Sequence, residues 1–266
     1  MKFLAATFLI MLSYMMGFSQ TPKKAETVTL NGVKIYYEVY GKGEPLFLCH
    51  GFTQSSKSWH PYISDYASDF EVYLVDLRGH GKSSLFTEKF SVQAVAKEID
   101  DLIRYLKLNH INGIGYSYGG DVLLQLELRH PGLIKSMITI GTCGTWHAKE
   151  FPEFVEYLSY KNIENLPWMR EQQTSEDQIK SILAQVPNYN VSISEEELKS
   201  IQSRTLLVHG DQDVATPIDC LAKAKKYLPN SFMWVQPNVA HGAHSDKSKP
   251  EFIRISKEFL SGAWSQ

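Results

Sequence analysis

Cysteine, net charge and long apolar runs are all scarce in this sequence. The three cysteines, Cys49, Cys143 and Cys220, are an odd number and include no CxxC pair, so no disulfide framework is expected to support the fold. Cys49 and Cys143 lie in apolar, strand-like runs, where a buried thiol packs as a small apolar side chain. We therefore expect all three cysteines to be free thiols.

The near balance of charges argues against one class of partner. The 27 Lys and Arg residues against 29 Asp and Glu residues give a formal net charge of -2, and the isoelectric point is about 6.5. Nucleic-acid binders need a clustered basic surface to neutralise phosphates, so a small molecule is the expected partner. The 266 residues, 43% of them hydrophobic, suffice for one or at most two globular units with a full core.

The one long apolar run lies at the start of the chain. A single lysine is followed by the apolar run 3–16 and then by small residues up to Ser19, which is the layout of a secretory signal peptide. We expect residues 1–19 to be removed just before Gln20, so that the protein is exported to the periplasm or the medium. An uncleaved membrane anchor is the alternative, but the run is short for a membrane span and contains polar residues.

Strand-like and helix-like segments alternate along the rest of the chain. Two strand-like runs joined by Asn31 and Gly32 predict an antiparallel hairpin, because this pair suits the positive φ angles of a tight turn. Six apolar runs follow that are long enough for strands covered on both faces: PLFLCHG, FEVYLVDLRG, INGIGYS, SMITIGT, TLLVHGD and SFMWVQ. Amphipathic segments lie between them, most clearly after Ser91, a suitable N-cap. This alternation predicts an α/β fold with a mostly parallel, doubly wound sheet of about eight strands.

One interval breaks the alternation. Residues 145–203 contain no good strand, and they carry many aromatic side chains among charged ones. A structureless loop of that length inside a compact domain would be unusual. We interpret the interval as an inserted helical segment.

The segment GIGYSYGGD, residues 113–121, places a serine at the expected junction of a strand and a helix. Gly115, Ser117 and Gly119 form the GxSxG pattern, a sharp turn that holds the serine in a strained conformation with its hydroxyl above the sheet. Glycines are needed because the strand and helix backbones pass too close for a β-carbon. The alternative is a glycine-rich turn with an incidental serine, but the flanking strand and helix favour a nucleophile.

A serine hydroxyl is a weak nucleophile at neutral pH, and it needs a base that is oriented by a third group. In the nucleophile-elbow architecture the acid and the histidine follow the serine in that order, each after a strand. Asp211 and Asp213 follow one predicted strand, and His241 and His244 follow the next. The sequence therefore predicts a Ser-His-Asp triad, with two candidates for each partner of Ser117.

In these motifs the chain resembles the α/β-hydrolases over essentially its whole mature length. LCHGF, DLRGHGKS, GYSYGG, HGDQD and PNVAHG occur in the family's order. The resemblance implies that Asp213, the second aspartate of the GDxD group, is the acid and that Asp211 is a turn residue. The PN..HG context favours His241 as the base. Neither His241 nor His244 has the family's usual spacing to the last helix, so His244 stays the alternative.

The resemblance also implies two donors for the oxyanion of a tetrahedral intermediate. These are the backbone N–H groups of Phe52, directly after HG, and of Tyr118, directly after the nucleophile. His50 and His80 lie in motifs that shape loops in the family. Both histidines are expected to support those loops and to take no part in the chemistry.

The family carries its cap where the inserted segment lies. The insertion 145–203 is accordingly interpreted as a helical cap on a core domain made of 20–144 and 204–266. Aromatic residues of a cap can line an apolar acyl pocket. Trp146 and Trp168 are the residues that we expect to bind substrate.

A serine at position 117 argues against the branches of the family that attack carbon through an aspartate, the dehalogenases and epoxide hydrolases. Acyl transfer remains, and carboxylic esters of small or medium acyl chain are the expected substrates. Alternatives are hydrolysis of amides, peptide ends, thioesters or carbon–carbon bonds, cofactor-free peroxidase activity, and a non-catalytic binding protein of the same fold. No cofactor is expected. No metal is expected either, because HGAHSD has no second ligand cluster to accompany it.

Overall fold

The computed structural model describes residues 21–264, so the predicted signal peptide, residues 1–19, lies outside the described residues. Within that range, none of the helices combines the length and the apolar character that crossing a membrane requires. The core is an 8-stranded sheet in the order β1-β2-β4-β3-β5-β6-β9-β10. Its strands are β1 (Lys24–Leu30), β2 (Val33–Gly41), β3 (Glu44–Cys49), β4 (Phe70–Asp76), β5 (Ile111–Tyr116), β6 (Ile134–Ile140), β9 (Arg204–Gly210) and β10 (Ser231–Gln236).

Only the first strands of this sheet are antiparallel. β1 pairs with β2, and β2 with β4, in antiparallel register, whereas the pairs from β4 to β10 are parallel. The predicted hairpin is confirmed: Leu30 faces Val33, and Asn31 and Gly32 turn the chain with φ angles of 50° and 83°. The predicted mostly parallel sheet of about eight strands is confirmed as well.

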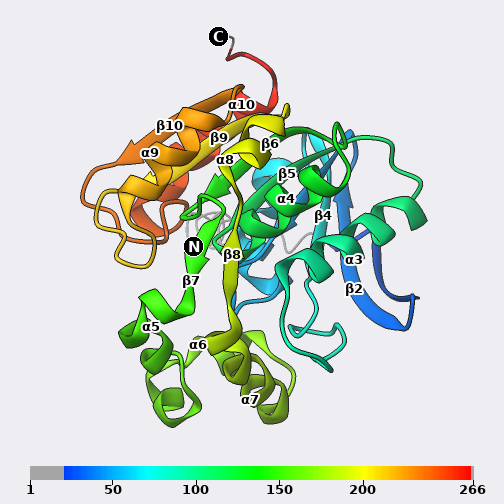
Figure 1. Ribbon diagram of the computed structural model, residues 1–266. Coiled ribbons are helices and arrows are strands. Elements are labelled where there is room, and N and C mark those ends of the chain that lie inside the picture. Colours follow the sequence, from blue (N-terminus) through cyan, green and yellow to red (C-terminus); the bar gives the residue numbers. More distant parts are fainter. Residues whose placement is uncertain (1–20, 265–266) are drawn as a thin grey trace, which may run out of the picture.

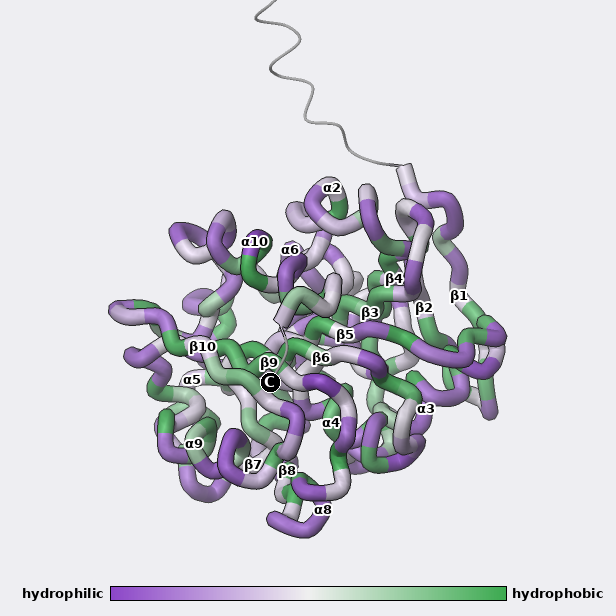
Figure 2. Tube along the Cα trace, turned by 90° about the horizontal axis from the view of Figure 1, so that it is seen from above, coloured by the Kyte–Doolittle hydropathy of each residue, from purple (hydrophilic) through white to green (hydrophobic). Residues whose placement is uncertain are grey.

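Helices cover both faces of the sheet (Figure 2). On one face lie α3 (Val92–Tyr105), α4 (Tyr118–Arg129) and α9 (Ile218–Tyr227). On the other lie the 3-10 helix η1 (Ser56–Tyr62), α2 (Ile63–Tyr66) and α10 (Lys249–Leu260). Ser91 caps α3, as predicted, by accepting a hydrogen bond from the N–H of Ala94 at 3.3 Å.

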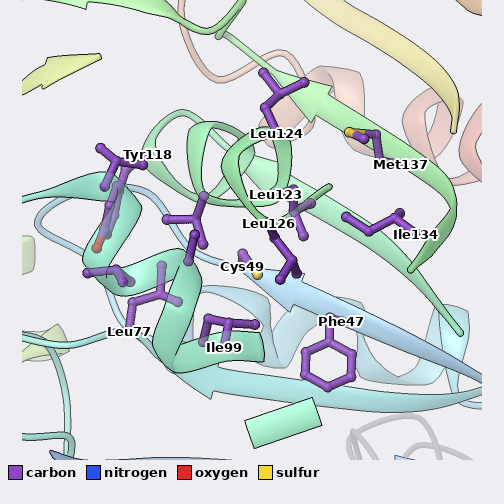
Figure 3. Packing of buried hydrophobic residues seen from close by; sticks show 14 of the residues in the cluster. Phe47, Cys49, Leu77, Ile99, Tyr118, Leu123, Leu124, Leu126, Ile134 and Met137 are labelled. Atoms are coloured by element: carbon purple, nitrogen blue, oxygen red, sulfur yellow. The ribbon is translucent and has the colours of Figure 1, made fainter. Parts of the chain in front are cut away.

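Apolar residues of α4 fix this helix against the sheet (Figure 3). Leu123 and Leu126 are fully buried in one cluster with Phe47 of β3 and Met137 of β6. Each such side chain contributes about 1.5–3 kcal/mol to the free energy of unfolding. The packing therefore holds the N-terminus of α4, where the serine lies, rigidly above the sheet.

The insertion 145–203 forms a separate layer over residues 152–185, whereas its last helix, Glu195–Ser200, packs beside the core (Figure 1). It consists of β7 (Thr145–His147), η2 (Ala148–Glu150), α5 (Pro152–Tyr157), η3 (Tyr160–Asn165), α6 (Trp168–Gln172), α7 (Glu176–Gln185), η4 (Val186–Asn188), β8 (Asn190–Ser192) and α8 (Glu195–Ser200). It has an apolar core of its own, made of Leu158, Ile163, Leu166, Met169, Ile179, Ile182, Leu183 and Val186. We call this segment the cap.

The prediction that the cap contains no strand is wrong. β7 and β8 pair antiparallel, with Trp146 opposite Val191. These strands of three residues each are too short to show an alternating pattern in the sequence. They pair because the chain enters and leaves the cap at the same place above the sheet.

The prediction of three free cysteines is also wrong. Cys143, which follows β6, and Cys220 of α9 form a disulfide with a Cα–Cα distance of 5.9 Å, and only Cys49 is a buried free thiol. The two cysteines are 77 residues apart, and neither their number nor their local pattern indicates the pairing. The disulfide joins the chain at the entrance of the cap to α9, which packs on the sheet.

Candidate active site

Ser117 lies between β5 and α4 in a backbone conformation that non-glycine residues rarely adopt, with φ 50° and ψ -115°. Its N–H donates to the carbonyl oxygen of Ile140 at 2.7 Å, so the turn is held from β6. A β-carbon at Gly115 would overlap the backbone of Gly119, and one at Gly119 would overlap the carbonyl of Cys49. The glycines of GxSxG therefore allow the close approach that keeps the serine in this strained turn.

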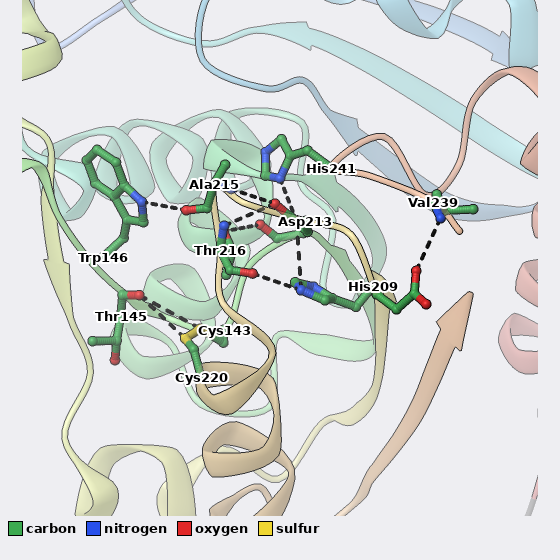
Figure 4. A network of polar contacts seen from close by, with 12 residues as sticks. Cys143, Thr145, Trp146, His209, Asp213, Ala215, Thr216, Cys220, Val239 and His241 are labelled. Carbon is green, nitrogen blue, oxygen red and sulfur yellow. Dashed lines mark hydrogen bonds and ion pairs between the residues drawn. A yellow bond between two sulfur atoms is a disulfide. The ribbon is translucent and has the colours of Figure 1, made fainter. Parts of the chain in front are cut away.

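Asp213 and His241 lie in the loops that follow the carboxyl ends of β9 and β10 (Figure 4). Oδ2 of Asp213 is 2.8 Å from Nδ1 of His241, and Oδ1 accepts hydrogen bonds from the N–H groups of Ala215 and Thr216 at 2.9 and 3.0 Å. The Asp213 side chain is fully buried, and that of His241 is 24% exposed. Because Asp213 occupies Nδ1, Nε2 of His241 is left free to take up a proton.

His244, the alternative base, has different surroundings. Its ring packs against the aromatic rings of Tyr116, Tyr62 and Trp59, and burial lowers its pKa to about 3. Its Nδ1 has no hydrogen-bond partner among the described residues. Asp213 is bonded to His241 instead, so the geometry favours His241 as the base.

Asp211 stabilises the turn after β10 by accepting hydrogen bonds. Its Oδ1 accepts hydrogen bonds from the N–H groups of Asn238 and Val239 at 2.6 and 3.3 Å. It thus acts on the loop that leads to His241, in keeping with the turn role predicted for it.

A pocket between the core and the cap brings these groups together. Ser117 and His241 line it on the core side. The rest of its lining is Gly51, Phe52, Thr53, Gln54, Tyr116, Asp121, Gly141, Thr142, Trp146, Phe154, Tyr157, Leu158, Trp168, Val186, Tyr189, Ala215 and Thr216. The serine and the histidine therefore face one substrate-sized space under an aromatic roof.

Of the two predicted oxyanion donors, Phe52 lines the same pocket as Ser117, and Tyr118 directly follows Ser117 in the chain. Within the described residues, the N–H of Phe52, in the loop after β3, donates to no backbone oxygen. In the first turn of α4, the N–H groups of Gly120 and Asp121 bond to the carbonyl of Ser117. Tyr118, as the first residue of that helix, has an N–H with no intrahelical partner. Both N–H groups are available to an oxygen bound beside Ser117.

A comparison with models of protein families matches residues 44–193, more than half of the chain, to the alpha/beta hydrolase fold. This chain belongs to that family. The α/β hydrolase is 25% identical to the non-heme chloroperoxidase CPO-A1 of Kitasatospora aureofaciens, over 88% of this chain and 98% of the relative. It is 32% identical to the pimeloyl-[acyl-carrier protein] methyl ester esterase of Aeromonas hydrophila, over only 44% of this chain and 45% of the relative.

Solved structures show the same fold at lower identity. The meta-cleavage product hydrolase of Pseudomonas fluorescens IP01 superposes with a TM-score of 0.74 and 17% sequence identity, covering 90% of this chain and 98% of that one. Relatives and neighbours thus include a chloroperoxidase, an esterase and a meta-cleavage product hydrolase. Because the named activities differ, membership of the family does not by itself identify the substrate of this protein.

Two buried histidines hold the loop after β3, residues 50–55, which we call the oxyanion loop because it carries the predicted donor Phe52. Nε2 of His50 accepts a hydrogen bond from the N–H of Leu77 at 3.0 Å, and its Nδ1 lies 2.8 Å from the carbonyl of Gly51. Nε2 of His80 accepts from the N–H of Thr53 at 3.3 Å. Burial lowers their pKa values to about 4 and about 3. Both rings therefore stay neutral at neutral pH and hold the loops after β3 and β4 by hydrogen bonds, which is the role expected from their motifs.

The two tryptophans expected at the substrate pocket both line it. Nε1 of Trp146, in β7, donates to the carbonyl of Ala215 in the loop of Asp213, at 2.8 Å. Nε1 of Trp168, in α6, donates to Oγ1 of Thr53 in the oxyanion loop, at 3.2 Å. Each ring therefore forms the pocket wall and also ties the cap to a loop of the core.

Sequence reasoning missed Asp121 and Tyr189 in this α/β hydrolase. Asp121 lies four residues after Ser117, only 2% exposed, and receives a hydrogen bond from the hydroxyl of Tyr189 at 2.7 Å. Its place in the first turn of a helix is common for an acid because it favours the helix dipole. Because the helix dipole already accounts for an acid at this position, the sequence does not indicate that Asp121 lies in the pocket. Tyr189 stands in the cap, and nothing in its local sequence indicates the contact.

Side chains that could bind a metal ion do not form a cluster in the part of the chain that the structure describes. Across residues 21–264, no group of three or more His, Cys, Asp and Glu side chains is arranged to hold a metal ion. The expectation that the protein needs no metal and no cofactor stays a prediction.

Proposed function

We propose that this protein is a serine hydrolase that cleaves carboxylic esters through an acyl-enzyme intermediate. The observation that carries the proposal is the strained Ser117 in one pocket with His241, whose Nδ1 is bound to the buried Asp213 at 2.8 Å. A serine placed in this way is the nucleophile of an acyl transfer. Asp213 and His241 are then the orienting acid and the general base.

Acylation follows from these positions. Nε2 of His241 takes the proton of the Ser117 hydroxyl as its oxygen attacks the ester carbonyl, and the imidazolium that forms is stabilised by Asp213. The carbonyl oxygen becomes an oxyanion that accepts hydrogen bonds from the N–H groups of Phe52 and Tyr118. Each such donor is worth about 10²–10³ in rate. His241 then gives its proton to the leaving alcohol.

Deacylation uses the same groups with water in place of the alcohol. His241 removes a proton from water, which attacks the acyl carbon, and the proton returns to the oxygen of Ser117. During this time the acyl chain lies against the apolar side chains of the cap that line the pocket, among them Phe154, Leu158 and Val186. A pocket of this kind suits an acyl chain of small or medium length.

Hydrolysis of p-nitrophenyl esters from acetate to decanoate tests the proposal. We expect turnover by the chain without residues 1–19, with a maximum at a small or medium acyl length. Ser117→Ala is expected to lower kcat by about 10⁴-fold or more without changing the melting temperature, because the hydroxyl is its only loss. Circular dichroism of both proteins provides the folding control.

Two outcomes count against ester hydrolysis. Folded protein that turns over no ester of the series would redirect the assignment to amide or carbon–carbon substrates, or to a binding protein. Turnover that survives in Ser117→Ala would place the nucleophile elsewhere.

We further propose that the protein is exported. The disulfide between Cys143 and Cys220 supports this, because such bonds persist in oxidising compartments. Mass spectrometry of protein from an exporting host is expected to find Gln20 as the first residue. A chain that keeps residues 1–19 and stays inside the cell would contradict export.

A further inference from the structure

A carboxylate that the proposed mechanism does not use lies in the wall of the active-site pocket. Asp121 belongs to the first turn of α4, one helical turn after Ser117, and lines the same pocket as Ser117 and His241. It is 2% exposed. Burying a carboxylate is costly unless donors compensate it, so its presence calls for an explanation beyond the fold.

Two hydroxyl groups partly compensate Asp121. Oδ1 accepts a hydrogen bond from the hydroxyl of Thr142, in the loop that leads to the cap, and Oδ2 accepts one from Tyr189, where the chain returns from the cap. The backbone N–H of Gly144 also stabilises the charged form, and because a carboxylate has about four acceptor positions, these three donors leave room for little more than one further hydrogen bond. No lysine or arginine is among its hydrogen-bond or ion-pair partners within the described residues.

Asp121 also determines the charge of the pocket lining. Among the described residues, its lining includes neither lysine nor arginine, and Asp121 is its only carboxylate. Burial raises the pKa of the Asp121 carboxyl to about 6, so at pH 8 the side chain is negatively charged. An anionic acyl group would have to be buried next to this charge with no lysine or arginine in the pocket lining to balance it, whereas an uncharged group would not.

We infer that Asp121 is a specificity-determining residue that restricts this pocket to uncharged acyl groups and excludes acyl groups that end in a carboxylate. The inference rests on the proposed ester hydrolysis and names the substrate class of that same site. Repulsion between two unit charges several ångströms apart at a partly buried site corresponds to about tenfold or more in affinity. The residue acts by its charge, and it takes no part in bond breaking.

The test compares two p-nitrophenyl esters that differ only at the end of the acyl chain, the hexanoate and the monoester of adipic acid. At pH 8 the second is an anion. We expect the wild-type protein to prefer the hexanoate, measured as the ratio of the two kcat/KM values. Asp121→Asn keeps the shape and removes the charge, and it is expected to lower that ratio about tenfold or more.

Tyr189→Phe is the matched control. It removes the hydrogen bond to Oδ2 but keeps the carboxylate, so any disturbance of the wall affects both esters alike and the ratio stays high. Melting temperatures of both variants report on folding. Because a ratio is measured, a general loss of rate does not mimic the expected result.

Each remaining outcome overturns the inference. An unchanged ratio in Asp121→Asn would show that the charge does not select substrates, and an equal fall in Tyr189→Phe would show that only the hydrogen-bonded wall matters. Wild-type protein that hydrolyses both esters equally well would contradict the exclusion itself. Wild-type protein that hydrolyses neither would overturn the proposed function, and the inference with it.

Discussion

The core side of the active-site pocket presents polar atoms that backbone hydrogen bonds hold in place, whereas the cap side presents aromatic rings that pack on one another. On the core side, Asp213 is fixed by the N–H groups of Ala215 and Thr216. On the cap side, Trp146 stacks on Phe151 with ring centroids 5.1 Å apart. Changes on the core side should therefore alter the rate, and changes on the cap side should alter the choice of substrate.

The largest expected effect comes from two histidines of the core side that are three positions apart. His241→Ala should lower kcat by about 10⁴–10⁶-fold and leave stability nearly unchanged. His244→Ala should instead lower the free energy of unfolding by about 3 kcal/mol, because it leaves a cavity among aromatic rings. Ester hydrolysis and urea denaturation of the two variants measure both effects. The reverse pattern would make His244 the base.

The disulfide lies within the core, where the chain enters the cap, and should give the next largest effect. Replacing Cys143 and Cys220 together by alanine is expected to lower the free energy of unfolding by about 2–4 kcal/mol, since a long loop in the unfolded chain is no longer closed. Denaturation with and without reductant measures this loss. Cys49→Ala is the control: it keeps the disulfide, so it should still lose stability with reductant, whereas the double variant should not respond. Equal stability of wild-type protein in both conditions would contradict a supporting disulfide.

A smaller effect is expected from the cap side. Trp168→Leu should enlarge the pocket and move the preferred acyl chain to greater length, with a change of about tenfold in kcat/KM between neighbouring lengths. Tyr160→Leu is the matched control, because Tyr160 is a partly exposed aromatic residue of the cap that does not line the pocket. A chain-length profile that Trp168→Leu leaves unchanged would remove this residue from substrate binding.

The smallest expected effect is a dependence of stability on pH, which comes from the buried histidines His50 and His80. The pKa values of His50 and His80 are lowered to about 4 and about 3 by burial, below about 6.5 in the unfolded chain. Between these values the unfolded state binds more protons, so each histidine lowers stability by up to about 1.4 kcal/mol per pH unit as the pH falls below about 6.5.

Denaturation at pH 7, 6 and 5 tests this dependence. His80→Gln should reduce the fall in the free energy of unfolding at low pH by about the contribution of one histidine. Its amide oxygen can still accept a hydrogen bond from the N–H of Thr53, but it does not titrate. The exposed His110→Gln serves as the matched control. Identical slopes for His80→Gln and wild-type protein would show that His80 is not held neutral by the fold.

The difference between the core side and the cap side also explains which features of the site could be predicted from the sequence. Residues such as Ser117, Asp213 and His241 follow strands, and the carboxyl ends of parallel strands meet at one edge of a sheet, so local motifs sufficed to bring them together. The pairing of Cys143 with Cys220 depends on how α9 packs beside the end of β6, and the contact of Asp121 with Tyr189 depends on how the chain returns from the cap. No local pattern carries that information, so these contacts required the structure.

Mass spectrometry of protein quenched during hydrolysis of a p-nitrophenyl ester is the most direct test of the proposal that Ser117 carries the acyl group. We expect one acyl group per chain, located on the peptide that contains Ser117 and absent from Ser117→Ala. Hydrolysis without any acylated protein, or an acyl group on another residue, would contradict it.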